Sequence, residues 1–170
     1  MSKIPIIFKT NVYKDKRGFF KELLLKKNIK FNNIFTACSY SKKNVIRGLH
    51  YQVKKPQSKI ISILLGSALD VCVDIDKKSK NYGKVYKFLL KPGLMLYVPP
   101  TFAHGIGFYD SDNILLYHLS EYRHAKLERG IIYNDKTLKI NWKIKKPITS
   151  KRDSLMPTMK ETFPKKFKKK

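Results

Sequence analysis

Two histidines and an arginine in this chain have the chemistry needed to move protons on an anionic substrate. The segment Ile46–Gln52 reads Ile-Arg-Gly-Leu-His-Tyr-Gln, so Arg47 and His50 fall within one short apolar stretch. His104 lies far along the chain, after a run that ends Pro-Pro-Thr-Phe-Ala. An imidazole titrates near neutral pH, and a guanidinium binds phosphate or carboxylate groups well. We expect the fold to bring the two segments together in one pocket.

The same histidines are too few for a metal site. The stretch from Gly93 to His104 resembles the second motif of cupin jelly rolls, Gly-x5-Pro-x-Gly-x-x-His, with Thr101 in place of the second glycine. The first cupin motif needs His-x-His followed by Glu. Here Gln52 stands where the second histidine would be, and no Glu follows before Glu121. Because a transition metal takes three or four such ligands, we expect no metal and no cofactor.

The elements that would position these residues are short strands. Turn signals such as Gly66-Ser67 and Pro99-Pro100 recur between short β-prone segments, which is typical of an all-β barrel or sandwich. The expected strands are 4–9, 19–25, 34–39, 45–53, 59–65, 68–75, 85–90, 94–98, 102–109 and 114–119. Hairpins are expected around Gly66-Ser67 and around the turn at 110–113. A short helix is expected within 150–161, and a helical turn or a loop at 123–129.

Length and charge restrict the class of protein. The 170 residues fit one domain, expected over 1–164, followed by a basic tail over 165–170 that we expect to be disordered. The net charge of +25 favours anionic partners, but 32 of the 37 basic residues are lysines spread along the chain, which favours a solvated surface. Cys38 and Cys72 have no metal-ligand spacing, and the N-terminus has no signal-peptide pattern. We therefore expect a cytoplasmic protein with two reduced thiols and no membrane partner.

Several motifs, in this order and spacing, resemble the dTDP-4-dehydrorhamnose 3,5-epimerase family over residues 5–158. The resemblance implies a cupin-type jelly-roll barrel with short peripheral and C-terminal helices. The motifs are Asp15-x-Arg-Gly-Phe-Phe-x-Glu22, Arg47-Gly-Leu-His-Tyr-Gln52, Gln57-x-Lys59, Asp70-Val-x-Val-Asp74, Ser79-x-x-Tyr-Gly83, Val98-Pro-Pro-x-Phe-Ala-His-Gly105, Asn134-Asp135, Ile140-x-Trp142 and Ser150-Lys-Arg-Asp153.

The resemblance also implies a reaction. In a 4-keto sugar the hydrogens on C3 and C5 are acidic, because the carbanion is an enolate. The family pattern makes His50 the base, paired with Asp153, and Tyr117 the acid that returns a proton from the opposite face. It places the ammonium of Lys59 near the developing enolate oxygen, where such fixed charge is most effective.

The remaining implied site residues bind the substrate. Arg47 is expected to bind the diphosphate. The others contact the nucleotide or line the pocket, partly across the interface of a homodimer that shares its N-terminal segment: Arg17, Phe20, Glu22, Gln52 and His104.

The resemblance leaves some alternatives open. The enzyme could act at C3, at C5 or at both positions, and the base and the sugar are undetermined. A sugar-nucleotide 3,4-ketoisomerase would share the fold, and a basic nucleic-acid-binding barrel would account for the charge. Arg123 departs from the family pattern, which commonly has an aromatic residue there, in a region expected near the sugar and base.

Overall fold

Two five-stranded sheets form the body of the protein. The computed structural model describes residues 3–24 and 29–164. The first sheet, in spatial order, consists of β1 (Ile6–Lys9), β9 (Leu94–Val98), β6 (Lys59–Leu65), β11 (Asp112–Leu119) and β4 (Phe35–Lys42). The second consists of β12 (Glu128–Gly130), β5 (Ile46–Gln52), β10 (Phe102–Phe108), β7 (Ala68–Asp74) and β8 (Val85–Leu90). All these pairings are antiparallel.

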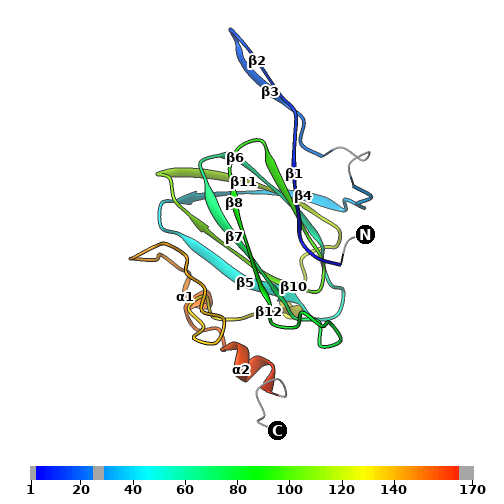
Figure 1. The fold of residues 1–170 in the computed structure, drawn as a ribbon, viewed down its shortest axis with the longest axis vertical. Helices are drawn as coiled ribbons and strands as arrows, with labels where there is room; N and C mark the ends of the chain where they lie inside the picture. Colours follow the sequence, from blue (N-terminus) through cyan, green and yellow to red (C-terminus); the bar gives the residue numbers. More distant parts are fainter. Residues whose placement is uncertain (1–2, 25–28, 165–170) are drawn as a thin grey trace.

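The sheets face one another and enclose the main core (Figure 1). The strands alternate, so Ile61 and Leu115 of the first sheet meet Ile106 and Phe108 of the second in one buried cluster. The chain after β12 runs over the outer face of the second sheet, where Trp142 and other residues form a second buried cluster. This arrangement is a jelly-roll barrel, as the sequence predicts.

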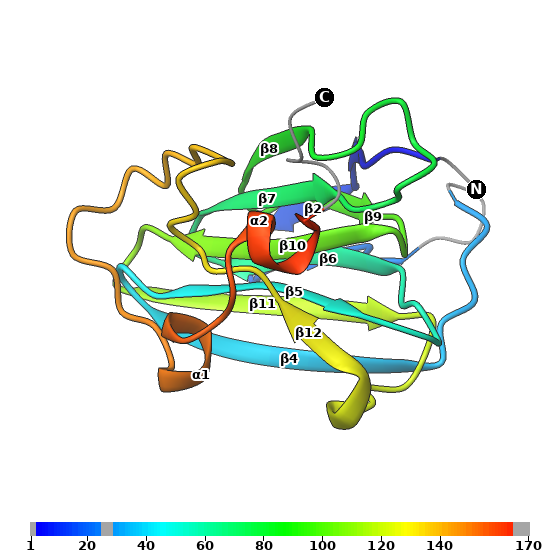
Figure 2. The same cartoon turned by 90° about the horizontal axis from the view of Figure 1, so that it is seen from below.

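Two short helices lie on the β5–β12 side of the barrel (Figure 2). Helix α1 (Lys151–Ser154) begins where the Ser150 side chain accepts a hydrogen bond from the Asp153 amide. Helix α2 (Met159–Thr162) begins with a capping box between Thr158 and Glu161. The expected helix within 150–161 is therefore two single turns. The 3₁₀ helix η1 (Ala125–Leu127) precedes β12.

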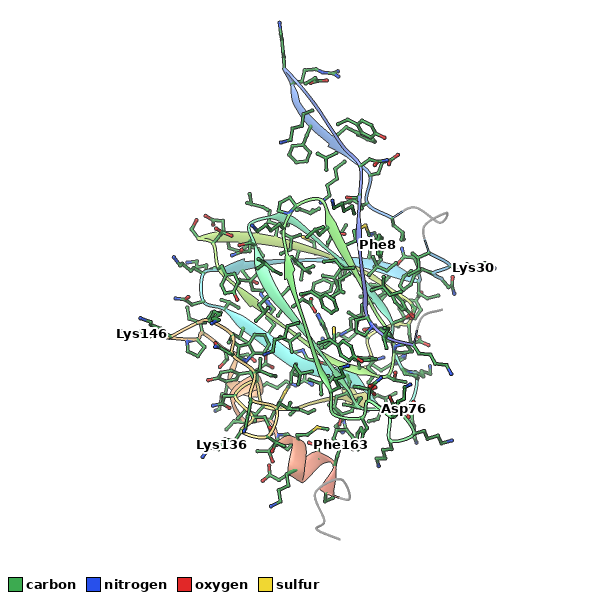
Figure 3. The ribbon with its side chains drawn as sticks, in the orientation of Figure 1. Phe8, Lys30, Asp76, Lys136, Lys146 and Phe163 are labelled. Carbon is green, nitrogen blue, oxygen red and sulfur yellow. The ribbon has the colours of Figure 1, made fainter. Side chains whose placement is uncertain are left out.

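A two-stranded arm projects from the barrel. Strands β2 (Val12–Asp15) and β3 (Gly18–Lys21) pair only with each other, and Figures 1 and 3 show them standing clear of the body. At the base of the arm, Phe8 of β1 packs against buried residues on the outer face of the first sheet. The Lys21 ammonium donates a hydrogen bond to the Ile63 carbonyl of β6 at 3.1 Å. The base of the arm is thus attached to the barrel, while its tip is not.

Both expected hairpins are wrong. Strands β6 and β7, on either side of Gly66-Ser67, belong to different sheets, and so do β10 and β11 on either side of the turn at 110–113. In a jelly roll the chain crosses between sheets at such corners, so a tight turn need not join paired strands. The strands at 12–15 and 128–130 were not predicted. The predicted single domain stays a prediction, and the tail over 165–170 lies outside the described residues.

Candidate active site

His50 and His104 lie opposite one another on neighbouring strands. They are register partners in the antiparallel ladder of β5 and β10, so the two segments do meet. Gly48 makes this close approach possible. Its φ is +108°, and a Cβ there would lie 2.6 Å from the His104 carbonyl oxygen. A side chain at position 48 would push β5 away from β10 at the histidines.

The His50 ring is bound to a buried carboxylate. Its Nε2 lies 2.9 Å from Oδ1 of Asp153 in α1, and Oδ2 of Asp153 accepts a hydrogen bond from the Gly48 amide at 3.1 Å. Burial acts to raise the pKa of Asp153, but the hydrogen bonds from His50 and Gly48 outweigh it and leave that pKa below its ordinary value. Asp153 is therefore held as an anion beside the ring.

His104 has its own carboxylate deeper in the barrel. Its Nε2 lies 2.7 Å from Oδ2 of Asp70, which is fully buried on β7. Burial lowers the pKa of His104, with Asp70 opposing the shift in part and Lys59 and His50 adding to it. His104 is therefore predominantly neutral at neutral pH.

Tyr117 and Lys59 reach the same pocket from the opposite sheet. They lie on β11 and β6 and line, with both histidines, a cavity of about 540 Å³. Burial raises the pKa of Tyr117 to about 12, so its phenol keeps its proton at neutral pH. Burial lowers the pKa of Lys59, and the charges of Asp70 and Glu128 are among those that oppose part of this shift. The pocket thus offers an imidazole on one wall and a protonated phenol and an amine on the other.

Two residues predicted to bind substrate line the pocket but are also tied to the protein. Arg47 donates from Nε to Ser41 Oγ at 3.0 Å and from Nη2 to the Tyr40 carbonyl at 2.9 Å. The Gln52 amide nitrogen donates to the carbonyls of Lys55 and Tyr122, and its oxygen accepts from the His124 amide.

The other three predicted substrate-binding residues lie on or beside the arm, away from this pocket. The Arg17 side chain is 90% exposed and forms an ion pair with Asp15 at 2.6 Å. Phe20 is 68% exposed, and Glu22 accepts a hydrogen bond from Asn11 at 2.9 Å. Within one chain the structure does not bring Arg17, Phe20 and Glu22 to His50.

Four further charged residues surround the histidines: Asp70, Arg123, Glu128 and Arg152. Of these, only Arg123 was expected near the substrate from the sequence, and the other three were given no role there. Asp70 binds His104. Glu128, on β12, lies 4.0 Å from Nδ1 of His50 and forms ion pairs with Arg123 and Arg152. The sequence did hold a signal for Asp70, because it is an acidic residue in the middle of a largely apolar strand. Glu128 had none, since its short strand was not predicted.

The described residues contain no group of three or more His, Cys, Asp or Glu side chains placed to bind a metal ion. The arrangement suits acid–base chemistry on an anionic substrate. It combines a carboxylate-bound imidazole, a protonated phenol and several cations around one cavity. In the same part of the chain, no helix is long and apolar enough to cross a membrane.

Comparison with known proteins points to one family. The sequence model described as dTDP-4-dehydrorhamnose 3,5-epimerase matches residues 4–161. The enzyme of that name from Shigella flexneri is 33% identical over 163 residues, which cover 89% of this chain and 90% of the relative.

Solved structures give the same result. The dTDP-4-dehydrorhamnose 3,5-epimerase of Bacillus anthracis, with TDP and PPi bound, is 32% identical with a TM-score of 0.87 and covers 91% of this chain and 94% of its own. The dTDP-6-deoxy-D-glucose-3,5-epimerase of Legionella pneumophila, in complex with dTDP-4-keto-L-rhamnose, is 30% identical with a TM-score of 0.86. It covers 92% of this chain and 89% of its own.

Proposed function

Since the chain belongs to the dTDP-4-dehydrorhamnose 3,5-epimerase family of isomerases, we propose that it inverts C3 and C5 of a nucleoside-diphosphate 4-keto-6-deoxy sugar. The observation that carries the proposal is the contact of 2.9 Å between His50 and the buried Asp153, inside a cavity that Tyr117 also lines. These groups can remove a proton beside a ketone and return one from the other side.

His50 acts as the base in this proposal. Its Nε2 is engaged by Asp153, which leaves Nδ1 to accept the proton from C3 or C5. The electron pair of the broken C–H bond moves into a carbon–carbon double bond to C4, and the negative charge collects on the C4 oxygen. The Asp153 carboxylate stabilises the imidazolium that forms.

Lys59 and Tyr117 complete the step. The Lys59 ammonium stabilises the enolate oxygen, and the Tyr117 phenol donates its proton to the carbon from the opposite face, which inverts that centre. Strand β5 lies in one sheet, and β6 and β11 lie in the other, which is the arrangement that two-sided proton transfer requires. The C4 carbonyl reforms. Before the second centre reacts, the His50 imidazolium gives its proton to solvent and the Tyr117 phenolate takes one from solvent.

We also propose that the active protein is a homodimer in which the arm of one chain completes the pocket of the other. Arg17 and Phe20 are exposed on the arm and do not line the pocket of their own chain, yet the family pattern makes them nucleotide contacts. Tyr13 and Phe19 are also more than half exposed there, and a partner would cover them. The dimer is closed and two-fold symmetric, so each arm serves the other site.

A cytoplasmic location stays a prediction. It is supported by the free thiols of Cys38 and Cys72, since reducing compartments keep cysteines unpaired.

The test is product identification by NMR with a panel of 4-keto sugar nucleotides, including dTDP-4-keto-6-deoxyglucose. The proposal expects inversion at C3 and C5 with the carbonyl still at C4. A carbonyl moved to C3 would indicate the ketoisomerase reaction instead. No product from any member of the panel would contradict the proposal.

A further inference from the structure

Two arginines meet on one carboxylate at the edge of the cavity. Arg123 donates from Nε to Oε2 of Glu128 at 2.7 Å, and Arg152 donates from Nη1 to Oε1 at 2.8 Å. The Glu128 side chain is only 9% exposed, whereas those of Arg123 and Arg152 are 62% and 44% exposed. The carboxylate is therefore covered, and the two guanidinium groups face outward.

These guanidinium groups keep most of their donors for a ligand. A guanidinium has five N–H donors. Within the described residues, the Arg123 side chain donates a hydrogen bond to the protein only from Nε, and that of Arg152 only from Nη1. Arg47, near the start of β5, donates from Nε and Nη2 to Ser41 and Tyr40, both in β4. Donors for an anion are thus more numerous at the Arg123 end of the pocket.

The backbone that carries Arg123 is held on both sides. Gln52 donates to the Tyr122 carbonyl at 3.2 Å and accepts from the His124 amide at 2.7 Å. The Tyr122 ring also stacks on Phe35, with centroids 5.9 Å apart and planes 9° from parallel. The position of the Arg123 guanidinium is therefore set before a ligand arrives, which lowers the entropic cost of binding.

We propose that Arg123 is a further substrate-binding residue, which forms with Arg152 part of the binding site for the diphosphate of the substrate. This inference rests on the proposed function, which supplies a substrate with a diphosphate. Two guanidinium groups and one carboxylate leave a net charge of +1, and planar guanidinium groups match phosphate oxygens in pairs. Because Glu128 also lies 4.0 Å from His50, a diphosphate bound here leaves the attached sugar within reach of the base.

The test compares TDP, TMP and thymidine binding by calorimetry at fixed ionic strength. The variant is Arg123→Gln, and the matched control is Arg129→Gln. Arg129 is exposed on β12, beside Glu128, and donates only to the backbone carbonyls of Lys126 and Glu128. The inference expects TDP binding to weaken about tenfold or more in Arg123→Gln, because a charge-assisted hydrogen-bonded contact is lost. Thymidine binding should be unchanged, and Arg129→Gln should bind all three like the wild type.

Arg123→Lys distinguishes a loss of TDP binding from misfolding, since a lysine keeps the charge and can still pair with Glu128. It should recover only part of the TDP affinity, because an ammonium lacks the planar pair of donors. Equal weakening in Arg123→Gln and Arg129→Gln would overturn the inference and assign the effect to overall charge. Unchanged TDP binding in Arg123→Gln would also overturn it. Wild-type epimerase activity, measured on the same preparation, separates either failure from a failure of the proposed function.

Discussion

His50 and His104 are register partners on β5 and β10, and each imidazole binds its own buried carboxylate through Nε2. Their exposures differ, because the His50 side chain is 27% exposed and that of His104 only 5%. One ring can therefore meet a substrate directly, while the other is largely enclosed. Two similar pairs thus have different uses.

Replacing the Asp153 carboxylate should slow catalysis with little change in shape. Asp153→Asn keeps the side-chain volume but removes the charge beside His50. We expect kcat/KM to fall by about 10²–10⁴-fold, the usual contribution of general base catalysis. The control is Asp74→Asn, since Asp74 is also buried but hydrogen-bonds Ser79 and Asp76 in a loop. A loss of the same size in both variants would show that Asp153 matters only for folding.

Removing the Tyr117 hydroxyl should separate proton removal from inversion. In Tyr117→Phe, His50 can still form the enolate but must return the proton to the face it came from. In D2O we expect deuterium to enter the substrate with retention of configuration. Tyr109→Phe is the control, because the Tyr109 hydroxyl donates to the Trp142 carbonyl and lies outside the catalytic pair. Full inversion by Tyr117→Phe would contradict the role of Tyr117 as the acid.

The protein should lose stability as the pH falls below the ordinary histidine value of 6.5. Burial lowers the pKa of both His104 and His118, so the unfolded chain takes up protons there that the folded chain does not. We expect urea midpoints to decrease from about pH 7 to about pH 5. The double variant with Asn at both positions should show a much flatter profile. An unchanged slope in that variant would assign the effect to other groups.

Mixing two inactive variants should restore activity if the arm is shared between chains. Equal amounts of His50→Ala and Arg17→Ala, unfolded and refolded together, should regain about a quarter of wild-type activity, since half of the dimers would hold one intact site. The pair His50→Ala and Tyr117→Phe should regain none, because both changes fall in the pocket of one chain. Equal recovery from both mixtures would rule out a shared arm.

Much of the fold could be predicted from alternating apolar residues and turn signals. Strands β6, β8 and β9 begin and end where expected, because apolar runs there are bounded by Gly, Pro or polar residues. The pairing could not be predicted, because corners such as Gly66-Ser67 join different sheets and depend on the closure of the whole barrel. Similarly, nothing in the local sequence marks the strand that carries Glu128.

The proximity of His50 to His104 was a hypothesis based on their residue types, and the pairing of His50 with Asp153 was implied by the family resemblance. Gln52 shows what sequence could not reveal, because its amide hydrogen-bonds backbone groups on both sides of Arg123. Such contacts join segments far apart in the chain, so no local pattern reports them. The Arg123–Glu128–Arg152 cluster is of the same kind.

The most direct test of the account is deuterium incorporation from D2O into a nucleoside-diphosphate 4-keto-6-deoxy sugar, followed by NMR. The wild-type protein should place deuterium at C3 and C5 and invert both centres, and His50→Ala should place none. If the wild-type protein leaves both positions unlabelled, or if His50→Ala exchanges them at the wild-type rate, proton transfer by His50 is contradicted.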